Sequence, residues 1–237
     1  LLMSKILSPK ELGWWSVPYK ITFAFQFVPV ALSASVYPVF SSLFLTEKDK
    51  IGQLFEKSWR YLFIIVLPLA FGLIAIADPV IRHVFGEQYI PSIFPLRILL
   101  LSLIFGFLAF ITGALLNATN KQKTQTGLVS VALVVNIILN LILLPVLKID
   151  GAAIAALVSN AALCLLGFYF SKKQVDINSS NILRYLKQAL WPALVMALVV
   201  YWLSFVISYI ITIVIGGVLY VALLYATRVI DKEMIML

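Results

Sequence analysis

The chain has 237 residues, of which 62% are apolar and only 12% are charged. Soluble domains contain about 45–50% apolar and about 25% charged residues, so this composition excludes a soluble globular protein and indicates a helical integral membrane protein. The formal net charge of +8 does not indicate nucleic-acid binding, because the lysines and arginines cluster between apolar stretches, where they set membrane topology.

Residues 1–7 are apolar, but they are too few to cross a membrane and lack the basic start and cleavage site of a signal peptide. We interpret them as the end of a preceding transmembrane helix, which predicts that the chain is the C-terminal part of a longer protein. Residues 8–16 are predicted to form a polar loop whose paired tryptophans, Trp14 and Trp15, lie at the headgroup level.

Seven complete spans are predicted from stretches of about 20 apolar residues, the length that a transmembrane helix needs. Their expected ranges are 17–44, 61–77, 92–116, 128–147, 152–170, 189–207 and 210–227. A short surface helix is expected before the second span, and an interfacial segment is expected at 80–89. Most lysines and arginines fall on the same side as the tail at 231–237, so the positive-inside rule places the C-terminus in the cytoplasm.

The first span carries a line of polar residues, which we call the polar stripe. Its members are Tyr19, Thr22, Gln26, Ser33, Tyr37 and Ser41. Their spacing places them on one face of a helix, and two prolines in the span interrupt backbone hydrogen bonding. Because polar groups in hydrocarbon are costly, this face either lines an aqueous path through the bundle or packs against other helices through its small hydroxyls.

The fifth span begins with small residues at helical spacing, which favours close approach of a neighbouring helix. The two series are Gly151, Ala155 and Ser159, and Ala152, Ala156 and Asn160. In the fourth span Asn136 and Asn140 are one turn apart and are expected to hydrogen-bond across helices. We interpret all of these residues as packing positions.

Several kinds of chemistry are missing from the sequence. There is no Walker-type glycine loop for ATP, no histidine pair, no cysteine pair and no zinc-ligand spacing. The single cysteine, Cys164, excludes a disulfide framework, and the single histidine, His83, is interpreted as a headgroup-level residue. No catalytic residue, metal site or cofactor is therefore predicted, and the chain is not expected to be an enzyme.

Two basic residues lie toward the outer ends of their spans, Lys20 in the first and Arg97 in the third. One interpretation is that both extend their charges to the outer interface. The other is that they attract an anionic headgroup such as a pyrophosphate, Arg97 through a bidentate fork and Lys20 as a point charge.

In chain order the sequence contains LGWWSVPYKI leading into a span with PVFSS, then VIRHVFGEQYIPS, LLNATNKQK, NIILNLILLP and GAAIAALVSN. This ordered set resembles the C-terminal half of polysaccharide and oligosaccharide flippases of the O-antigen-flippase type. These proteins belong to the multidrug/oligosaccharidyl-lipid/polysaccharide exporter superfamily. The resemblance covers nearly the whole chain.

The resemblance implies an all-α polytopic membrane bundle of about fourteen helices, in two lobes with two extra C-terminal spans. Residues 1–7 would end a truncated helix, residues 8–173 would form the C-terminal lobe, and residues 174–237 would form the additional spans and a cytoplasmic tail. The implied partners are a lipid-linked oligosaccharide, membrane lipids and the missing N-terminal lobe.

The implied function is secondary, non-ATP transport by alternating access in a bacterial or archaeal cytoplasmic membrane. The substrate would be a polyprenyl-pyrophosphate-linked oligosaccharide used for surface polysaccharide synthesis, bound by Lys20, Gln26, Ser33, Tyr37 and Arg97. The alternatives are a multidrug exporter of the same superfamily, and a membrane-embedded enzyme or scaffold of polysaccharide assembly.

Overall fold

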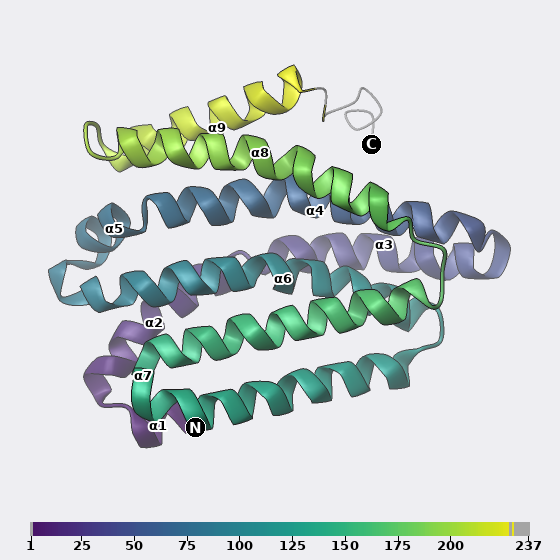
Figure 1. The fold of residues 1–237 in the computed structure, drawn as a ribbon, viewed down its shortest axis with the longest axis horizontal. Helices are drawn as coiled ribbons and strands as arrows, with labels where there is room; N and C mark the ends of the chain where they lie inside the picture. Colours follow the sequence, from purple (N-terminus) through teal and green to yellow (C-terminus); the bar gives the residue numbers. More distant parts are fainter. Residues whose placement is uncertain (1, 228, 230–237) are drawn as a thin grey trace.

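The computed structural model describes residues 2–227 and 229, and in this part of the chain all regular structure is helical (Figure 1). The α-helices are α1 (Leu2–Ile6), α2 (Pro9–Ala24), α3 (Phe27–Thr46), α4 (Asp49–Ala75), α5 (Ala77–Val80), α6 (Ile93–Ala118), α7 (Gln122–Lys172), α8 (Ser179–Leu203) and α9 (Tyr209–Ala226). A π-helical turn, η1 (Ile81–Phe85), and a 3-10 helix, η2 (Glu87–Ser92), connect α5 to α6. The tail predicted at 231–237 lies outside the described residues.

Six helical segments of the described chain are long and apolar enough to cross a membrane, with α2 and α3 counted together. The 51-residue α7 folds back on itself at Lys148, whose φ of 53° is not helical (Figure 1). Asn136 donates to the Ser159 hydroxyl over 3.0 Å, whereas a straight helix would separate them by about 35 Å. Helix α7 is therefore a hairpin, and the seven predicted spans are present once its limbs are counted separately.

The predicted loop at 8–16 is wrong, because α2 begins at Pro9. Ser8 caps this helix in a capping box: the Glu11 amide donates to the Ser8 side chain, and the Glu11 carboxylate accepts from the Ser8 amide over 2.8 Å. Proline at the first helical position needs no hydrogen-bond acceptor. The sequence SPKE is thus a helix start, and the polar character of these residues reflects capping.

The predicted span at 17–44 lies within one membrane-length segment, Pro9–Thr46, but its helix breaks between Ala24 and Phe27. Pro29 has no amide hydrogen to donate to the carbonyl four residues earlier, at Phe25. That carbonyl accepts from Val28 instead, and the chain passes through two turn residues before α3 begins. Gln26 therefore lies at the junction of two helices.

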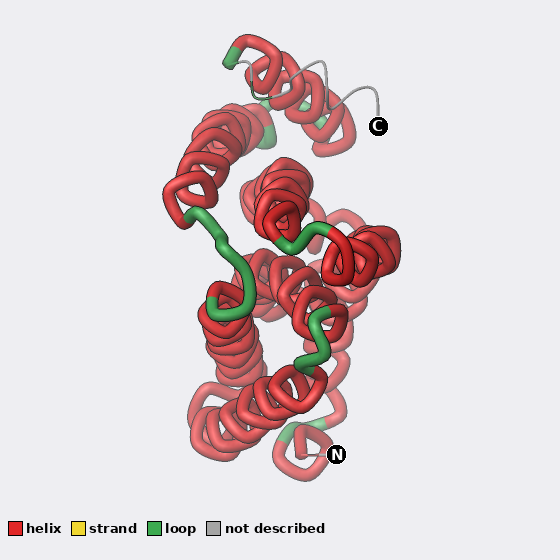
Figure 2. Tube along the Cα trace, turned by 90° about the vertical axis from the view of Figure 1, so that its right-hand side faces the viewer, coloured by secondary structure: helices red, strands yellow, loops and turns green. Residues whose placement is uncertain are grey.

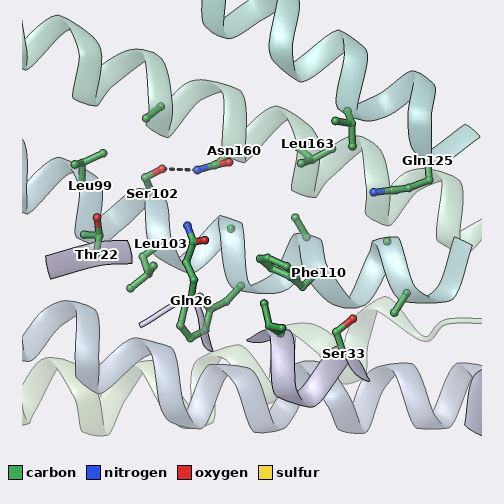
Figure 3. A pocket seen from close by; sticks show the side chains of 18 of the residues that line it. Thr22, Gln26, Ser33, Leu99, Ser102, Leu103, Phe110, Gln125, Asn160 and Leu163 are labelled. Carbon is green, nitrogen blue, oxygen red and sulfur yellow. Dashed lines mark hydrogen bonds between the residues drawn. The ribbon is translucent and has the colours of Figure 1, made fainter. Parts of the chain in front are cut away.

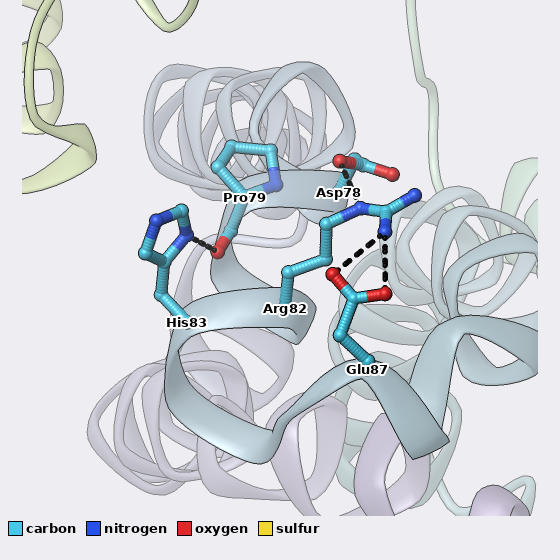
Figure 4. Close-up of polar contacts among 5 residues, drawn as sticks. All are labelled: Asp78, Pro79, Arg82, His83 and Glu87. Carbon is cyan, nitrogen blue, oxygen red and sulfur yellow. Dashed lines mark hydrogen bonds and ion pairs between the residues drawn. The ribbon is translucent and has the colours of Figure 1, made fainter.

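The surface helix expected before the second span and the span itself form a single helix, α4. The segment between α4 and α6 is held by a compact charge cluster (Figure 4). Arg82 donates to Asp78 over 2.9 Å and to Glu87 over 3.2 Å, while His83 bonds to the Pro79 carbonyl over 2.8 Å. These contacts close a tight turn.

The long helices run roughly parallel (Figure 2), and α8 and α9 pack at one side of the bundle, with α8 directly against α4 (Figure 1). The main apolar core joins α3, α4, α6 and α8 through buried side chains such as Phe40, Phe55, Phe107 and Met196. At one end of the α4–α8 contact, the buried Glu56 carboxylate accepts from the Asn178 amide and from the Asn181 side chain, over 2.8 and 2.7 Å. The opposite side of α6 faces α2, α3 and α7, where the cavity lies.

Candidate substrate cavity

A cavity of about 950 Å³ lies between the broken helix α2–α3, α6 and both limbs of α7. Its polar lining consists of Tyr19, Thr22, Gln26, Ser33, Tyr37, Ser102, Asn117, Gln125 and Asn160. The remaining lining is apolar and includes Trp15, Phe107 and Phe110. Among the described residues that line it, every polar side chain is therefore uncharged.

The polar stripe forms one wall of this cavity. Its members from Tyr19 to Tyr37 all line the space, and Ser41 is outside the lining. The break at Gln26 preserves this arrangement, because α2 contributes Tyr19 and Thr22 while α3 contributes Ser33 and Tyr37. The Thr22 hydroxyl donates within its own helix, to the Pro18 carbonyl over 2.9 Å. The sequence leaves open whether this face lines an aqueous path or packs against other helices. In the structure it lines a cavity.

The opposite wall carries a hydrogen-bonded pair from α6 and α7. Asn160 donates to the Ser102 hydroxyl over 2.9 Å, and the Gln26 amide points toward this pair across the cavity (Figure 3). From the sequence, Asn160 is interpreted as a packing position and Ser102 is not identified. The available signal is the polar end of a small-residue series, because Asn160 is the member of the series Ala152, Ala156 and Asn160 that carries hydrogen-bonding groups.

The far end of the cavity is lined by Asn117 and Gln125, neither of which is expected from the sequence pattern. Gln125 reaches the cavity because Gly113 on α6 leaves room for it: a Cβ at Gly113 would lie 2.9 Å from the Gln125 Nε2 atom. The Gln125 Oε1 atom is buried and has no hydrogen-bond partner in the described part of the chain. This amide is thus held against the cavity with an unused acceptor.

The two predicted cations are outside the lining. Lys20 is exposed, one residue after Tyr19. Arg97 is half-buried on α6, two residues before Leu99, and its Nε atom is buried without a partner in the described chain. The structure therefore brings Gln26, Ser33 and Tyr37 to one cavity and leaves Lys20 and Arg97 near its Trp15 end. Substrate binding by all five residues stays a prediction.

At the Trp15 end of the cavity, helix α2 is fixed by contacts that the sequence pattern does not predict. Glu11 pairs with Lys148 at the turn of the α7 hairpin, with 2.5 Å between Oε1 and Nζ. The Trp14 indole donates to the Gln88 carbonyl, and the Ser92 hydroxyl donates to the Trp14 carbonyl, each over 2.7 Å. The first part of the cavity wall is thereby tied to both the hairpin turn and η2.

The helical bundle has counterparts among known proteins. The family model described as lipid II flippase MurJ matches residues 20–220. The chain belongs to the MurJ family. Flippases are transporters rather than enzymes, so the family agrees with the expectation that this chain is not an enzyme.

Two known proteins are similar to this MurJ-family chain. A probable low-salt glycan biosynthesis flippase, Agl15 of Haloferax volcanii, is 25% identical over 172 residues, which are 72% of this chain and 36% of the relative. The solved structure of lipid II flippase MurJ in its inward closed conformation has a TM-score of 0.74 at 19% identity. The match covers 92% of this chain and 47% of that structure, so the chain spans less than half the length of either protein.

Proposed function

We propose that this chain is the C-terminal part of a secondary transporter that flips polyprenyl-pyrophosphate-linked oligosaccharide across the cytoplasmic membrane for surface polysaccharide synthesis. The observation that carries the proposal is the large cavity, with uncharged polar side chains in its walls, inside a membrane-length bundle of the MurJ family. A polar cavity at membrane depth is the feature that lets a hydrophilic glycan avoid hydrocarbon during passage.

In this proposal residues 8–173 form one lobe, residues 174–237 form two additional spans and a cytoplasmic tail, and an N-terminal lobe supplies the facing wall. Alternating access then exposes the cavity to one side of the membrane at a time. The break at Gln26 is suited to such movement, because two short helices joined at a turn can change their mutual angle more easily than one continuous helix.

The pyrophosphate is proposed to lie beside Lys20 and Arg97. Neither residue forms an ion pair within the described residues, and both are close in sequence to cavity-lining positions. Arg97 in particular is half-buried with an unpartnered Nε atom, and a phosphate would satisfy its fork of donors.

The identity of the transported glycan can be tested by complementation, because the family model and the archaeal relative suggest different substrates. The complete protein is expected to restore surface polysaccharide in a strain that lacks its own O-antigen-type polysaccharide flippase. The family description favours lipid II as the second candidate, which predicts rescue of a strain depleted of its lipid II flippase instead. Drug resistance without rescue of either strain would support the multidrug alternative and contradict the proposal.

Replacement Lys20→Ala is expected to lower export of the lipid-linked glycan about tenfold while leaving membrane insertion unchanged. Loss of one charge-assisted contact to a phosphate weakens binding by roughly 1.5–3 kcal/mol, and the Lys20 side chain is exposed, so its removal leaves no cavity in the core. The measurement is surface glycan per inserted protein, with Lys57→Ala, another exposed lysine, as the control. Normal export by Lys20→Ala would remove this residue from the site.

A further inference from the structure

We infer that Lys148, at the turn of the α7 hairpin, is a positioning residue for transport. Its ammonium group lies 2.5 Å from the Glu11 carboxylate at the start of α2. By neutralising that carboxylate, Lys148 holds the α2 wall of the cavity against α7, and its withdrawal from Glu11 releases the wall. The inference rests on the proposed function in taking the cavity as the path of the substrate.

The two charges of this pair differ in exposure. The Lys148 side chain is 64% exposed, whereas the Glu11 side chain is only 10% exposed. The Glu11 carboxylate also accepts from the amide and the hydroxyl of Ser8, over 2.8 and 2.9 Å, but these donors are neutral. Within the described residues its ion-pair partner is Lys148 alone. Without Lys148 the carboxylate is a nearly buried, unpaired charge, which is costly, and movement of α2 toward water lowers that cost.

The backbone of Lys148 is strained. Its φ of 53° and ψ of −129° are close to the first central position of a type II′ turn, where glycine is the usual residue. A residue with a Cβ atom adopts this conformation only at a cost in free energy. The lysine thus adds an ammonium group to a turn that a glycine would form without strain. Relaxation of this turn carries the ammonium group away from Glu11.

The hairpin turn is connected to the cavity wall by side-chain packing. A small apolar cluster joins the turn to the start of α2: Ile149 is one of its buried members, and Trp15 packs against it. Trp15 also lines the cavity, and Tyr19 follows it one turn later on the same face of α2. The second limb of α7 carries Asn160 in the opposite wall. The position of the turn therefore affects the separation of the two walls.

Other contacts of α2 determine how it moves when the pair is broken. The Trp14 indole donates to the Gln88 carbonyl, and the Ser92 hydroxyl donates to the Trp14 carbonyl. These bonds join uncharged groups, so loss of the ion pair leaves them in place. A released α2 therefore stays beside η2 and separates from the α7 hairpin, with the break at Gln26 as its hinge.

The test measures the distance between α2 and α7 with spin labels, in the complete protein in lipid nanodiscs without substrate. The labels are attached at Gly13→Cys on α2 and Val158→Cys on α7. A Cβ at Gly13 meets no heavy atom within 4 Å, and Val158 is 42% exposed. The buried Cys164 is replaced by alanine so that labelling is confined to the two sites.

Lys148→Gly removes the ammonium group and relieves the strain of the turn. This variant is expected to increase the population with the longer α2–α7 distance at least about fivefold, while its thermal unfolding midpoint stays close to that of the wild type. Lys148→Arg is the matched control, because it keeps a cation at the turn. It is expected to retain the wild-type distances.

A double variant tests whether the unpaired charge of Glu11 drives the movement. Glu11→Gln removes the charge and keeps the capping box with Ser8, which glutamine also forms. Added to Lys148→Gly, it is expected to restore the short distance, because no unpaired charge remains at the start of α2.

Unchanged distances in Lys148→Gly would overturn the inference, and so would a double variant that is as open as Lys148→Gly alone. A lower unfolding midpoint of Lys148→Gly with wild-type distances would show that the pair is merely structural, which also overturns it. These distances do not depend on the identity of the substrate. Failure of both complementation experiments, with the expected distances observed, would instead overturn the proposed function.

Discussion

Replacement Gly106→Trp is expected to reduce glycan export to background while the protein still folds and inserts. Gly106 lines the cavity on α6, next to the Ser102–Asn160 pair, and a Cβ there would lie 3.9 Å from the Asn160 Nδ2 atom, an ordinary contact distance. The first carbon is therefore accommodated, and the indole extends into space that the substrate needs. Because tryptophan also has the higher helix propensity, the substitution does not weaken α6.

The measurement is export of the lipid-linked glycan, normalised to inserted protein and paired with the thermal unfolding midpoint in detergent. Gly217→Trp is the matched control: Gly217 lies in α9, is exposed, and a Cβ added to it would have no heavy atom within 4 Å. The control is expected to export normally. Substantial export by Gly106→Trp with an unchanged unfolding midpoint would show that the substrate does not pass through this cavity.

The membrane class and the spans can be predicted from the sequence because they depend on local composition. A stretch such as 210–227 is apolar throughout, and its membrane length is readable without knowledge of its neighbours. The turn near Lys148 is equally local, since a charged, glycine-containing interval separates two apolar stretches. The polar stripe can be placed on one face because helical periodicity fixes which residues lie together.

The details of the cavity depend on information that periodicity does not carry. Whether a polar face meets a cavity or a neighbouring helix is decided by how far apart the helices lie. The break at Gln26 results from the missing proline donor four residues after Phe25, yet Pro38 lies within continuous α3, so proline alone does not predict a break. Lys20 is adjacent to the stripe in sequence, but adjacent residues on a helix point about 100° apart.

The burial of Glu56 likewise depends on a distant segment of the chain, so helical periodicity does not reveal it. Its neighbours Lys57 and Arg60 suggest a solvated loop, but Glu56 is buried because the start of α8 covers it and supplies two donors. The contact joins residues 122 and 125 positions apart in the chain. It also fixes the orientation of α8 on α4, on the side of the bundle opposite the cavity.

Replacement Gly52→Val is expected to lower the free energy of unfolding by about 3 kcal/mol. A Cβ at Gly52 would lie 1.8 Å from the carbonyl oxygen of Asp176, which is backbone and cannot move as the end of a side chain would. The segment before α8 must therefore shift away from α4. The Glu56 bonds to Asn178 and Asn181 depend on the same approach and are expected to weaken with it.

Thermal unfolding in detergent measures the loss, and limited proteolysis between α7 and α8 reports whether this segment has detached. Gly13→Val is the control, because a Cβ at Gly13 meets no heavy atom within 4 Å and the helical penalty for valine is the same. Gly52→Val and Glu56→Gln should also be strongly non-additive, since each disrupts the same contact. Additive effects, or a Gly52→Val protein as stable as Gly13→Val, would mean that the start of α8 is not held against α4 in this way.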